Sequence, residues 1–305
     1  MYAQRPPAGW FGPVLLDPGF LIVQTLNGLQ LAALLFLLSI GLSVVFGLMN
    51  FINLAHGTLF MAGAYLALSA VRAFDSFWLA LLLAPLGVAA LGALLYLVLL
   101  RHLERADPMR QVLATFGLIF VGVELVDLVW GSLPHTIALP PVLAGSSTIL
   151  GQVYPTYRLF IIALGVVLFG LLYAALERTR LGAVVRAGVD NRTMVAALGI
   201  NIGSVFFLVF CLGCLLAGLA GAVAAPVFSI FPGMDMSVLI LALIVVVLGG
   251  PGSLKGVAAG SLIIGVVDTY GQVVVPSLAR LTVYGLMAAI LLYKPAGLIP
   301  VRSGR

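Results

Sequence analysis

The sequence has very few charged residues. Only 8% of its 305 residues are Asp, Glu, Lys or Arg, and 63% are hydrophobic, whereas a soluble domain has roughly a quarter charged residues. Such a chain cannot cover a water-facing surface with polar groups, so a soluble enzyme or a soluble binding protein is excluded. The net charge of +5 would suit nucleic-acid binding, but the basic residues lie in loops between apolar segments. We therefore expect contact with membrane lipid and no nucleic-acid partner.

Residues for catalysis and for metal binding are also scarce. There are three histidines, His56, His102 and His135, and two cysteines, Cys211 and Cys214, which share one apolar run. A redox or metal site needs polar surroundings and further ligands, so we interpret the cysteines as packing residues. The sequence offers no nucleophile–base pair and no metal-ligand spacing. We expect no enzyme activity, no catalytic residue, no metal site and no cofactor bound by this chain.

Apolar runs of about 20 residues recur along the chain, and each can cross a hydrocarbon core of roughly 30 Å as a helix. The runs are continuously apolar, unlike the alternating strands of membrane barrels. Hydropathy predicts spans at about 20–46, 55–71, 77–100, 111–131, 157–176, 204–225, 236–250, 256–275 and 281–294. Because some of these are too short to cross alone, we expect an all-α polytopic membrane bundle of about eight transmembrane helices, within a range of six to ten.

Basic residues in the loops indicate the orientation. Clusters lie at about 101–110, 178–192 and 294–305, and even numbers of predicted spans separate them, so all three can face one side. Because positively charged loops stay in the cytoplasm, we expect these loops and the C-terminus to be cytoplasmic. The side of the N-terminal segment, residues 1–19, depends on whether residues 20–71 make two passes. We expect no cleaved signal peptide in that segment.

A polar stripe interrupts the first apolar region. Asn50, Asn53 and His56 follow a spacing of i, i+3 and i+6, which places them within about a 120° arc of one helix face. Such a stripe avoids lipid and turns to the bundle interior or to a water-filled path. We predict a discontinuous helix near 51–57 that ends at Gly57, and we name Asn50, Asn53, His56 and Gly57 as candidates for a translocation path. The alternative is that these side chains only satisfy backbone groups freed by the break.

The longest polar stretch, about 177–203, lies between two apolar spans. A short apolar face follows Asp190, a potential helix N-cap, and ends at Gly199. Its members are Met194, Ala197 and Leu198. A helix with a small apolar face between basic flanks suits docking into the groove of a partner. The alternative is a basic loop with a helix at the membrane interface.

A glycine-rich segment, Val247–Gly256, lies between two apolar runs near the C-terminus. It does not match the phosphate-binding pattern G-x-x-x-x-G-K-[ST], which occurs nowhere in the chain. It predicts a helix break near 249–256, formed by Gly249, Gly250, Pro251 and Gly252. Because the break near 51–57 is also apolar and rich in small residues, we hypothesise two related halves around one pathway. Breaks that lie far apart and at different depths would contradict this hypothesis.

Three acidic residues lie within the predicted spans. Glu124 and Asp127 are close to the expected outer end of their span, where water can solvate them. Asp268 is deeper, where a charge is costly unless it has a polar partner or a role in the path. Both readings of Asp268 stay open.

Four motifs together resemble the permeases of branched-chain amino acid ABC importers, the LivH and LivM type. They are G-x-x-x-x-x-G-x-x-x-x-I-N-x-A-H-G from Gly41 to Gly57, R-x-G…R-A…D…A-x-x-G-I-N from Arg180 to Asn201, V-L-G-G-x-G-S from Val247 to Ser253, and K-P-A-G-L from Lys294 to Leu298. With the order of the spans they cover nearly the whole chain. The first motif is closer to the LivH type, although Leu54 stands where Phe is usual. We expect one membrane-spanning permease domain over residues 1–305.

The resemblance implies a permease of a bacterial-type inner membrane that forms the path for branched-chain amino acids or a related small solute. Its implied partners are a second, LivM-like permease or a copy of itself, two cytoplasmic ABC ATPases that bind ATP and Mg²⁺, and an extracytoplasmic solute-binding protein. Within a cytoplasmic coupling loop at 177–203, residues 190–201 match the helix that docks on an ATPase. The corresponding residues are Asp190, Arg192, Ala196, Ala197, Gly199 and Ile200. A secondary transporter or channel for small polar solutes is the alternative function.

Overall fold

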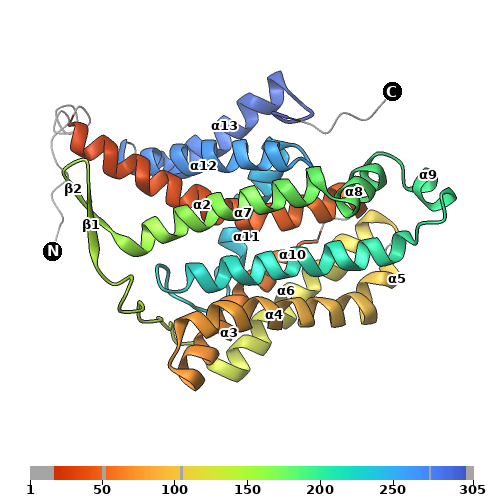
Figure 1. Cartoon of the computed structure of the whole chain (residues 1–305), viewed down its shortest axis with the longest axis horizontal. Helices are drawn as coiled ribbons and strands as arrows, with labels where there is room; N and C mark the ends of the chain where they lie inside the picture. The colour runs from red at the N-terminus through yellow and green to blue at the C-terminus, as the bar shows by residue number, and fades with distance from the viewer. Residues whose placement is uncertain (1–16, 50–52, 104–105, 275, 300–305) are drawn as a thin grey trace.

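The computed structural model describes residues 17–49, 53–103, 106–274 and 276–299, and the long apolar runs within them are helical (Figure 1). The longer helices are α2 (Pro18–Met49), α3 (His56–Phe74), α4 (Phe77–Leu95), α6 (Pro108–Trp130), α7 (Thr156–Arg178), α8 (Arg180–Asp190), α10 (Ile202–Ala224), α11 (Met234–Gly249), α12 (Leu254–Val274) and α13 (Ala279–Tyr293). The shorter elements are the π-helical turn η1 (Tyr96–Leu100), α5 (Arg101–Leu103), α9 (Arg192–Ala197), the 3₁₀ turn η2 (Pro276–Leu278), and the strands β1 (Ser146–Ile149) and β2 (Gln152–Pro155). The two strands form an antiparallel hairpin.

Seven of the described helices are long and apolar enough to cross a membrane. They are Pro18–Met49, His56–Phe74, Phe77–Leu103, Pro108–Trp130, Thr156–Arg178, Ile202–Ala224 and Leu254–Val274. Two further apolar helices, Met234–Gly249 and Leu281–Tyr293, are shorter. The prediction of an all-α, polytopic membrane bundle is therefore confirmed.

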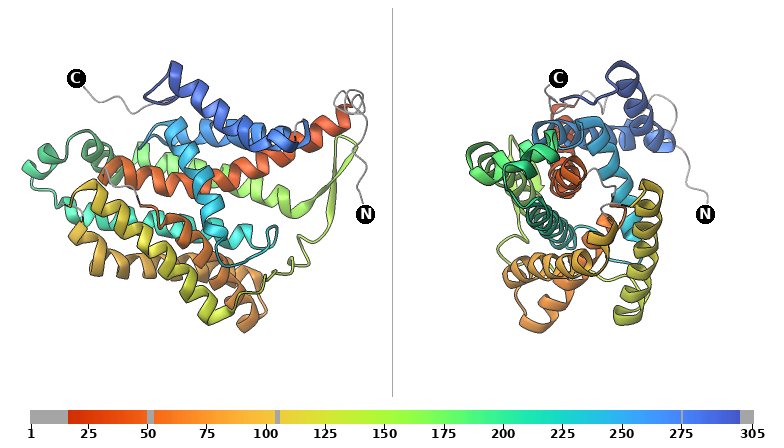
Figure 2. Two further views of the ribbon diagram at one scale, coloured as in Figure 1. Left: turned by 180° about the vertical axis from the view of Figure 1, so that it is seen from behind. Right: turned by 90° about the vertical axis from the view of Figure 1, so that its right-hand side faces the viewer.

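The chain runs back and forth along the long axis of the molecule and so defines two ends (Figures 1 and 2). The hairpin end carries β1, β2 and the start of α2, and the opposite end, the α8–α9 end, carries α8, α9 and α5. Helices α2 and α3 run in opposite directions along this axis, so the start of α2 and the end of α3 lie toward the same end (Figure 1). The described residues of the basic clusters at 101–110 and 178–192, and residues 294–299, lie toward the α8–α9 end, as their common orientation requires (Figure 1).

Helix α2 is the centre of the bundle. Every residue from Leu34 to Ser43 is buried, on all sides of the helix, and Figure 2 shows α2 surrounded by other helices when the molecule is viewed from one end. A helix that is hydrophobic all round can be buried in this way because no face needs water. By contrast, α6 and α7 keep most of their apolar side chains on the outside, as lipid-facing helices do.

Close helix crossings fix the neighbours of α2. A Cβ on Gly41 would lie 2.8 Å from the carbonyl oxygen of Gly213 on α10, and a Cβ on Gly265 of α12 would lie 2.6 Å from the carbonyl oxygen of Gly28. Only glycine permits such backbone contact at both places. In membranes, where the hydrophobic effect does not drive helices together, such small-residue contacts supply much of the packing energy.

The two predicted helix breaks lie at opposite ends of α11, which crosses the bundle between α3 and α12 (Figure 2). Of the first, the structure describes residues 53–57, and there Gly57 packs against the backbone of Asp235 at the start of α11. The second follows Gly249 at the other end of α11, about 21 Å away at about 1.5 Å per residue. The helices are interrupted at both places, but the expected helix end at Gly57 is wrong, because α3 begins at His56 and includes Gly57. The breaks are far apart, which gives no support to two related halves that bring them together, and that hypothesis stays untested.

Candidate functional site

Asn53 builds the turn that begins α3. Its side chain is 1% exposed, and its Oδ1 accepts a hydrogen bond from the backbone N–H of Ala55 at 3.1 Å. Its carbonyl oxygen accepts another from the N–H of His56 at 3.3 Å. The Asn53 side chain thus satisfies a backbone group at the break, as one of the two readings of the stripe expects. Asn50 lies outside the described residues.

His56 joins this turn to the central helix. The ring is 1% exposed, and its Nε2 lies 3.1 Å from the carbonyl oxygen of Leu38 on α2. The next residue, Gly57, has no room for a side chain, because a Cβ there would lie 2.8 Å from the carbonyl oxygen of Asp235. The structure therefore brings Asn53, His56 and Gly57 together in the packed interior. Their contact with a solute stays a prediction.

The second break is fastened to α2. Gly250 and Gly252 have φ angles of 99° and 74°, which favour glycine, and they turn the chain from α11 into α12. The N–H of Gly252 donates to the hydroxyl oxygen of Ser43 at 3.0 Å and to its carbonyl oxygen at 3.1 Å. A Cβ on Gly47 would lie 2.4 Å from the Cα of Gly252. The first and third sequence motifs are therefore in direct backbone contact.

The fourth motif, Lys294–Leu298, packs against the turn between α11 and α12. The N–H of Leu298 donates to the carbonyl oxygen of Leu248 at 2.7 Å, and the N–H of Ile299 donates to that of Gly249 at 3.3 Å. Gly297 permits this contact, because its φ is 88° and a Cβ there would lie 2.8 Å from the nitrogen of Gly250. These bonds satisfy carbonyl groups at the C-terminal end of α11, where the helix itself supplies no partners.

The segment after α7 forms two short helices rather than one. Asp190 is the last residue of α8, and the N-cap of α9 is Asn191, whose Oδ1 accepts from the N–H of Met194 at 3.0 Å. The predicted cap at Asp190 is thus wrong by one residue, because the asparagine side chain provides the same acceptor one position later. Gly199 ends the segment with a φ of 81°. Met194 and Leu198 are 62% and 74% exposed.

The other residues named for this segment lie on α9 or directly after it. Ala196 and Ala197 are exposed on α9, and Ile200 is half-buried just beyond Gly199. The backbone of Arg192 opens α9, while its side chain lies outside the described part of the chain. Figure 1 shows α9 projecting beyond the bundle at the α8–α9 end.

Helix α8 connects this projecting segment to the centre of the bundle. A Cβ on Gly188 would lie 2.8 Å from a methyl group of Leu48 near the end of α2. A small cavity of about 200 Å³ lies between Val185 of α8, Val44 of α2 and the turn at Gly252. The salt bridge of Arg186 to Glu177, at 3.6 Å, joins α8 to α7. All four sequence motifs thus meet around one end of α2.

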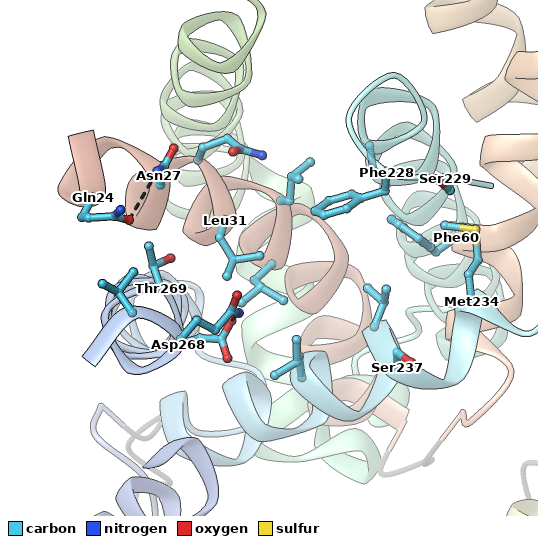
Figure 3. A pocket seen from close by; sticks show the side chains of 18 of the residues that line it. Gln24, Asn27, Leu31, Phe60, Phe228, Ser229, Met234, Ser237, Asp268 and Thr269 are labelled. Atoms are coloured by element: carbon cyan, nitrogen blue, oxygen red, sulfur yellow. Dashed lines mark hydrogen bonds between the residues drawn. The ribbon is translucent and has the colours of Figure 1, made fainter. Parts of the chain in front are cut away.

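A larger cavity, of about 510 Å³, lies toward the hairpin end between α2, α11 and α12 (Figure 3). Its polar lining consists of Gln24, Asn27, Gln30, Ser229, Ser237, Asp268, Thr269 and Gln272. Its apolar lining includes Leu31, Leu34, Phe60, Phe228, Phe231, Met234, Val238 and Leu241. Neither Asn53 nor His56 lines this cavity. Of the residues that the sequence analysis singled out, only Asp268 does.

Hydrogen bonds orient the polar groups of this cavity. The Oδ1 of Asn27 accepts from the hydroxyl of Tyr154 at 3.1 Å and from the guanidinium of Arg158 at 2.7 Å, so its Nδ2 is left to donate to Gln24 at 3.4 Å. On α12, the Nε2 of Gln272 donates to the Oδ2 of Asp268 at 2.6 Å. Burial raises the pKa of Tyr154, while the nearby Arg158 opposes the shift, so the phenol stays a donor at neutral pH.

The two other acids of the predicted spans differ from each other. Glu124 is exposed on the outside of α6, and its solvation by water stays a prediction. Asp127 is only partly exposed, and among the described residues its Oδ1 is buried without a hydrogen-bond partner. Asp127 therefore lies on the side of α6 that faces α3, near Tyr65, whereas Glu124 lies on the outer side.

Comparison with known proteins gives the family. The family described as branched-chain amino acid transport system / permease component matches residues 24–292. The chain belongs to this permease family. A permease protein of Pseudomonas aeruginosa, BraD, of a high-affinity branched-chain amino acid transport system, is 30% identical over 90% of this chain and 94% of its own length.

More distant relatives of the permease cover almost the same region. The LivH permease protein of Escherichia coli K12 is 25% identical over 92% of this chain and 96% of its own length. A probable LivH permease of Methanocaldococcus jannaschii is 26% identical over 88% of this chain. No solved structure was found to match. The family and the helical bundle together make this chain a multi-pass membrane permease.

Proposed function

We propose that this permease forms the translocation path of an ABC importer for branched-chain amino acids. The observation that carries the proposal is the family match over residues 24–292, together with relatives named for branched-chain amino acid transport. The cavity of about 510 Å³ supports it, because it combines polar groups with an aliphatic and aromatic wall. Sites for small molecules commonly have this size and this composition.

The energy for transport comes from partner chains in this proposal. The sequence contains no G-x-x-x-x-G-K-[ST] pattern, so two cytoplasmic ABC ATPases would bind the ATP and Mg²⁺, and this chain would perform no covalent chemistry. A second permease, LivM-like or a copy of this chain, would complete the path. A solute-binding protein would deliver the solute from outside.

The orientation follows from the common position of the basic loops. Positively charged loops favour the cytoplasm, so the α8–α9 end and the C-terminus would face inward and the hairpin end outward. Because α2 and α3 make two passes, the start of α2 would also lie outside. The cavity between α2, α11 and α12 would then face the side from which solute arrives.

The coupling of ATP hydrolysis to transport would pass through α9. Its exposed Met194 and Leu198 suit a groove on an ATPase, and α8 joins α9 to the end of α2 through Gly188 and Leu48. The turn at Gly252 contacts the same part of α2. A shift of α9 would therefore reach both α2 and the α11–α12 turn, the elements that border the cavity. Asn53, His56 and Gly57, at the start of α3, would line the path in another state of the cycle.

Uptake by cells with and without this chain tests the proposal. Deletion should abolish high-affinity uptake of labelled leucine, isoleucine and valine, and a plasmid copy should restore it, with urea and short amides as comparison solutes. Reconstitution decides the mechanism, since an importer needs the ATPases and ATP. Leucine transport by this chain alone in proteoliposomes would instead establish the alternative, a secondary transporter or channel.

A further inference from the structure

We propose that the cavity between α2, α11 and α12 binds the zwitterionic head group of an α-amino acid. Asp268 would receive the ammonium group, side-chain amides of α2 would receive the carboxylate, and the apolar wall would receive an aliphatic side chain. The inference deepens the proposed function and rests on it. It assigns a recognition role to one acidic residue and three amides.

The ammonium side of the site is Asp268. Among the described residues that line the cavity, it is the only one with a formal charge. Its Oδ2 is held by the Nε2 of Gln272 at 2.6 Å, which fixes the carboxylate and leaves Oδ1 available as an acceptor. A carboxylate within a membrane bundle is costly without a cationic partner, so it is a natural place for a solute's ammonium group.

The carboxylate side is formed by amides on one face of α2. Because Tyr154 and Arg158 occupy the oxygen of Asn27, its amide nitrogen is the group left for the cavity, and the bond from this nitrogen to Gln24 turns the Gln24 oxygen away from a ligand. The Gln24 nitrogen has no hydrogen bond within the described part of the chain, so it is a second donor for the cavity. Hydrogen-bond donors without full positive charge suit a carboxylate that is paired with its own ammonium group.

Gln30 adds a third amide to the α2 wall of the cavity. The residue is only 5% exposed and lines the cavity. Its amide has no hydrogen bond to another residue in the described part of the chain, and its atoms are not among the buried atoms that lack a partner, so they open to the cavity. A ligand that accepts its N–H groups would therefore take the place of water there.

The two chemical halves of the cavity are separated in space. In Figure 3, Asp268 and Thr269 on α12 and Gln24 and Asn27 on α2 lie on one side of the cavity, around Leu31, while the larger apolar side chains lie on the other side beside Ser229 and Ser237. These larger apolar side chains include Phe60, Phe228 and Met234. This separation matches an amino acid, in which a charged head and an apolar side chain leave the same carbon. A 2-oxo acid lacks the ammonium group and would meet Asp268 with the same sign of charge.

Ligand-induced stabilisation of the importer, without its binding protein, tests the site directly. The complex of permeases and ATPases in nanodiscs is heated with L-leucine, with 3-methylbutylamine, which lacks the carboxylate, or with 4-methyl-2-oxopentanoate, which lacks the ammonium group. Bound ligand raises the thermal midpoint in proportion to occupancy. We expect leucine to raise the midpoint most, the amine less, and the oxo acid not at all.

Two variants separate the halves of the site. Asp268→Asn should require at least about tenfold more leucine for the same shift, whereas the matched control Glu124→Gln, on the outside of α6, should behave as wild type. Gln30→Leu should reduce the leucine shift and leave the amine shift unchanged. If Asp268→Asn fails to assemble with the ATPases, the comparison of the leucine and amine shifts in Gln30→Leu still tests the inference.

The outcomes distinguish this inference from the proposed function. The inference is overturned if Asp268→Asn and Glu124→Gln respond to leucine alike, if Gln30→Leu lowers the amine shift as much as the leucine shift, or if the oxo acid stabilises the complex as well as leucine does. In those cases wild-type uptake of leucine with the binding protein would still support the proposed function. Absence of uptake of every branched-chain amino acid would instead remove the proposed function itself.

Discussion

The backbone N–H of Gly252 donates to both oxygens of Ser43, the hydroxyl at 3.0 Å and the carbonyl at 3.1 Å. The carbonyl of Ser43 lies in α2, about two turns before its end at Met49, where helix geometry already supplies a partner, so the turn between α11 and α12 is attached to a continuous helix. Contact this close is possible only because Gly47, one helical turn further, has no side chain.

Replacement of Gly47 by Ala should therefore weaken the bundle. The added Cβ would lie 2.4 Å from the Cα of Gly252, a backbone atom that cannot move aside alone. We expect a net loss of about 1–3 kcal/mol in the free energy of unfolding, despite the gain of about 1 kcal/mol that Ala brings to a helix interior. Thermal unfolding of the solubilised permease measures it. Gly117→Ala in α6, where a Cβ meets nothing within 4 Å, should be neutral or stabilising.

Replacement of Gly297 by Ala should release the C-terminal segment from the α11–α12 turn. The residue has a φ of 88°, and a Cβ would lie 2.8 Å from the nitrogen of Gly250. Hydrogen exchange at the amides of Leu298 and Ile299 should become about tenfold faster, since about 1–2 kcal/mol of backbone strain opposes the closed form. Gly285→Ala in α13, where a Cβ has open space, is the control. Equal protection in both variants would show that the segment is held by other contacts.

The bundle and its spans could be predicted from composition because twenty apolar residues have few alternatives to a membrane helix. Glycines such as Gly250 and Gly252 also marked the second break correctly, since their positive φ angles exclude most other residues. The neighbours of the breaks could not be predicted. That Gly57 packs on Asp235 while Gly252 packs on Ser43 depends on the path of α11 across the bundle, which no local pattern encodes.

One wall of the cavity has a sequence pattern that the sequence analysis did not interpret. Gln24, Asn27 and Gln30 follow the same i, i+3, i+6 spacing as Asn50, Asn53 and His56. Because the three amides lie near the start of the first span, a polar stripe there resembles an ordinary helix end in contact with water. Only the packing of α12 against α2 turns it into one wall of a cavity.

Replacement of Thr58 by Val should destabilise the start of α11. The hydroxyl of Thr58 donates to the Oδ2 of Asp235 at 2.9 Å, and Asp235 is 1% exposed. Among the described residues, the other oxygen of this carboxylate has no hydrogen-bond partner. We expect a loss of about 1–3 kcal/mol, as for a buried polar group that loses its hydrogen-bond partner, measured by thermal unfolding. The control Thr115→Val is also buried, but its hydroxyl reaches only carbonyl groups of its own helix, so its loss should be smaller.

Replacement of Gly199 by Val should uncouple ATP hydrolysis from uptake. Gly199 ends the α9 segment with a φ of 81°, and its N–H donates to the carbonyl oxygen of Ala196 at 3.0 Å. No atom lies within 4 Å of a Cβ built there, so the effect of Val comes from backbone strain rather than from packing. A β-branched residue resists this conformation by about 1–2 kcal/mol, which would reorient the end of α9 and displace its apolar face from an ATPase.

The measurement is the ratio of leucine transported to ATP hydrolysed in the reconstituted importer, and we expect Gly199→Val to lower it severalfold while membrane insertion and ATPase binding persist. Gly199→Asn is the matched control, because asparagine tolerates a positive φ and should retain most of the coupling. Since Val and Asn both add a side chain to the same open space, a difference between them isolates backbone conformation. An unchanged ratio in Gly199→Val would place the coupling contact elsewhere than α9.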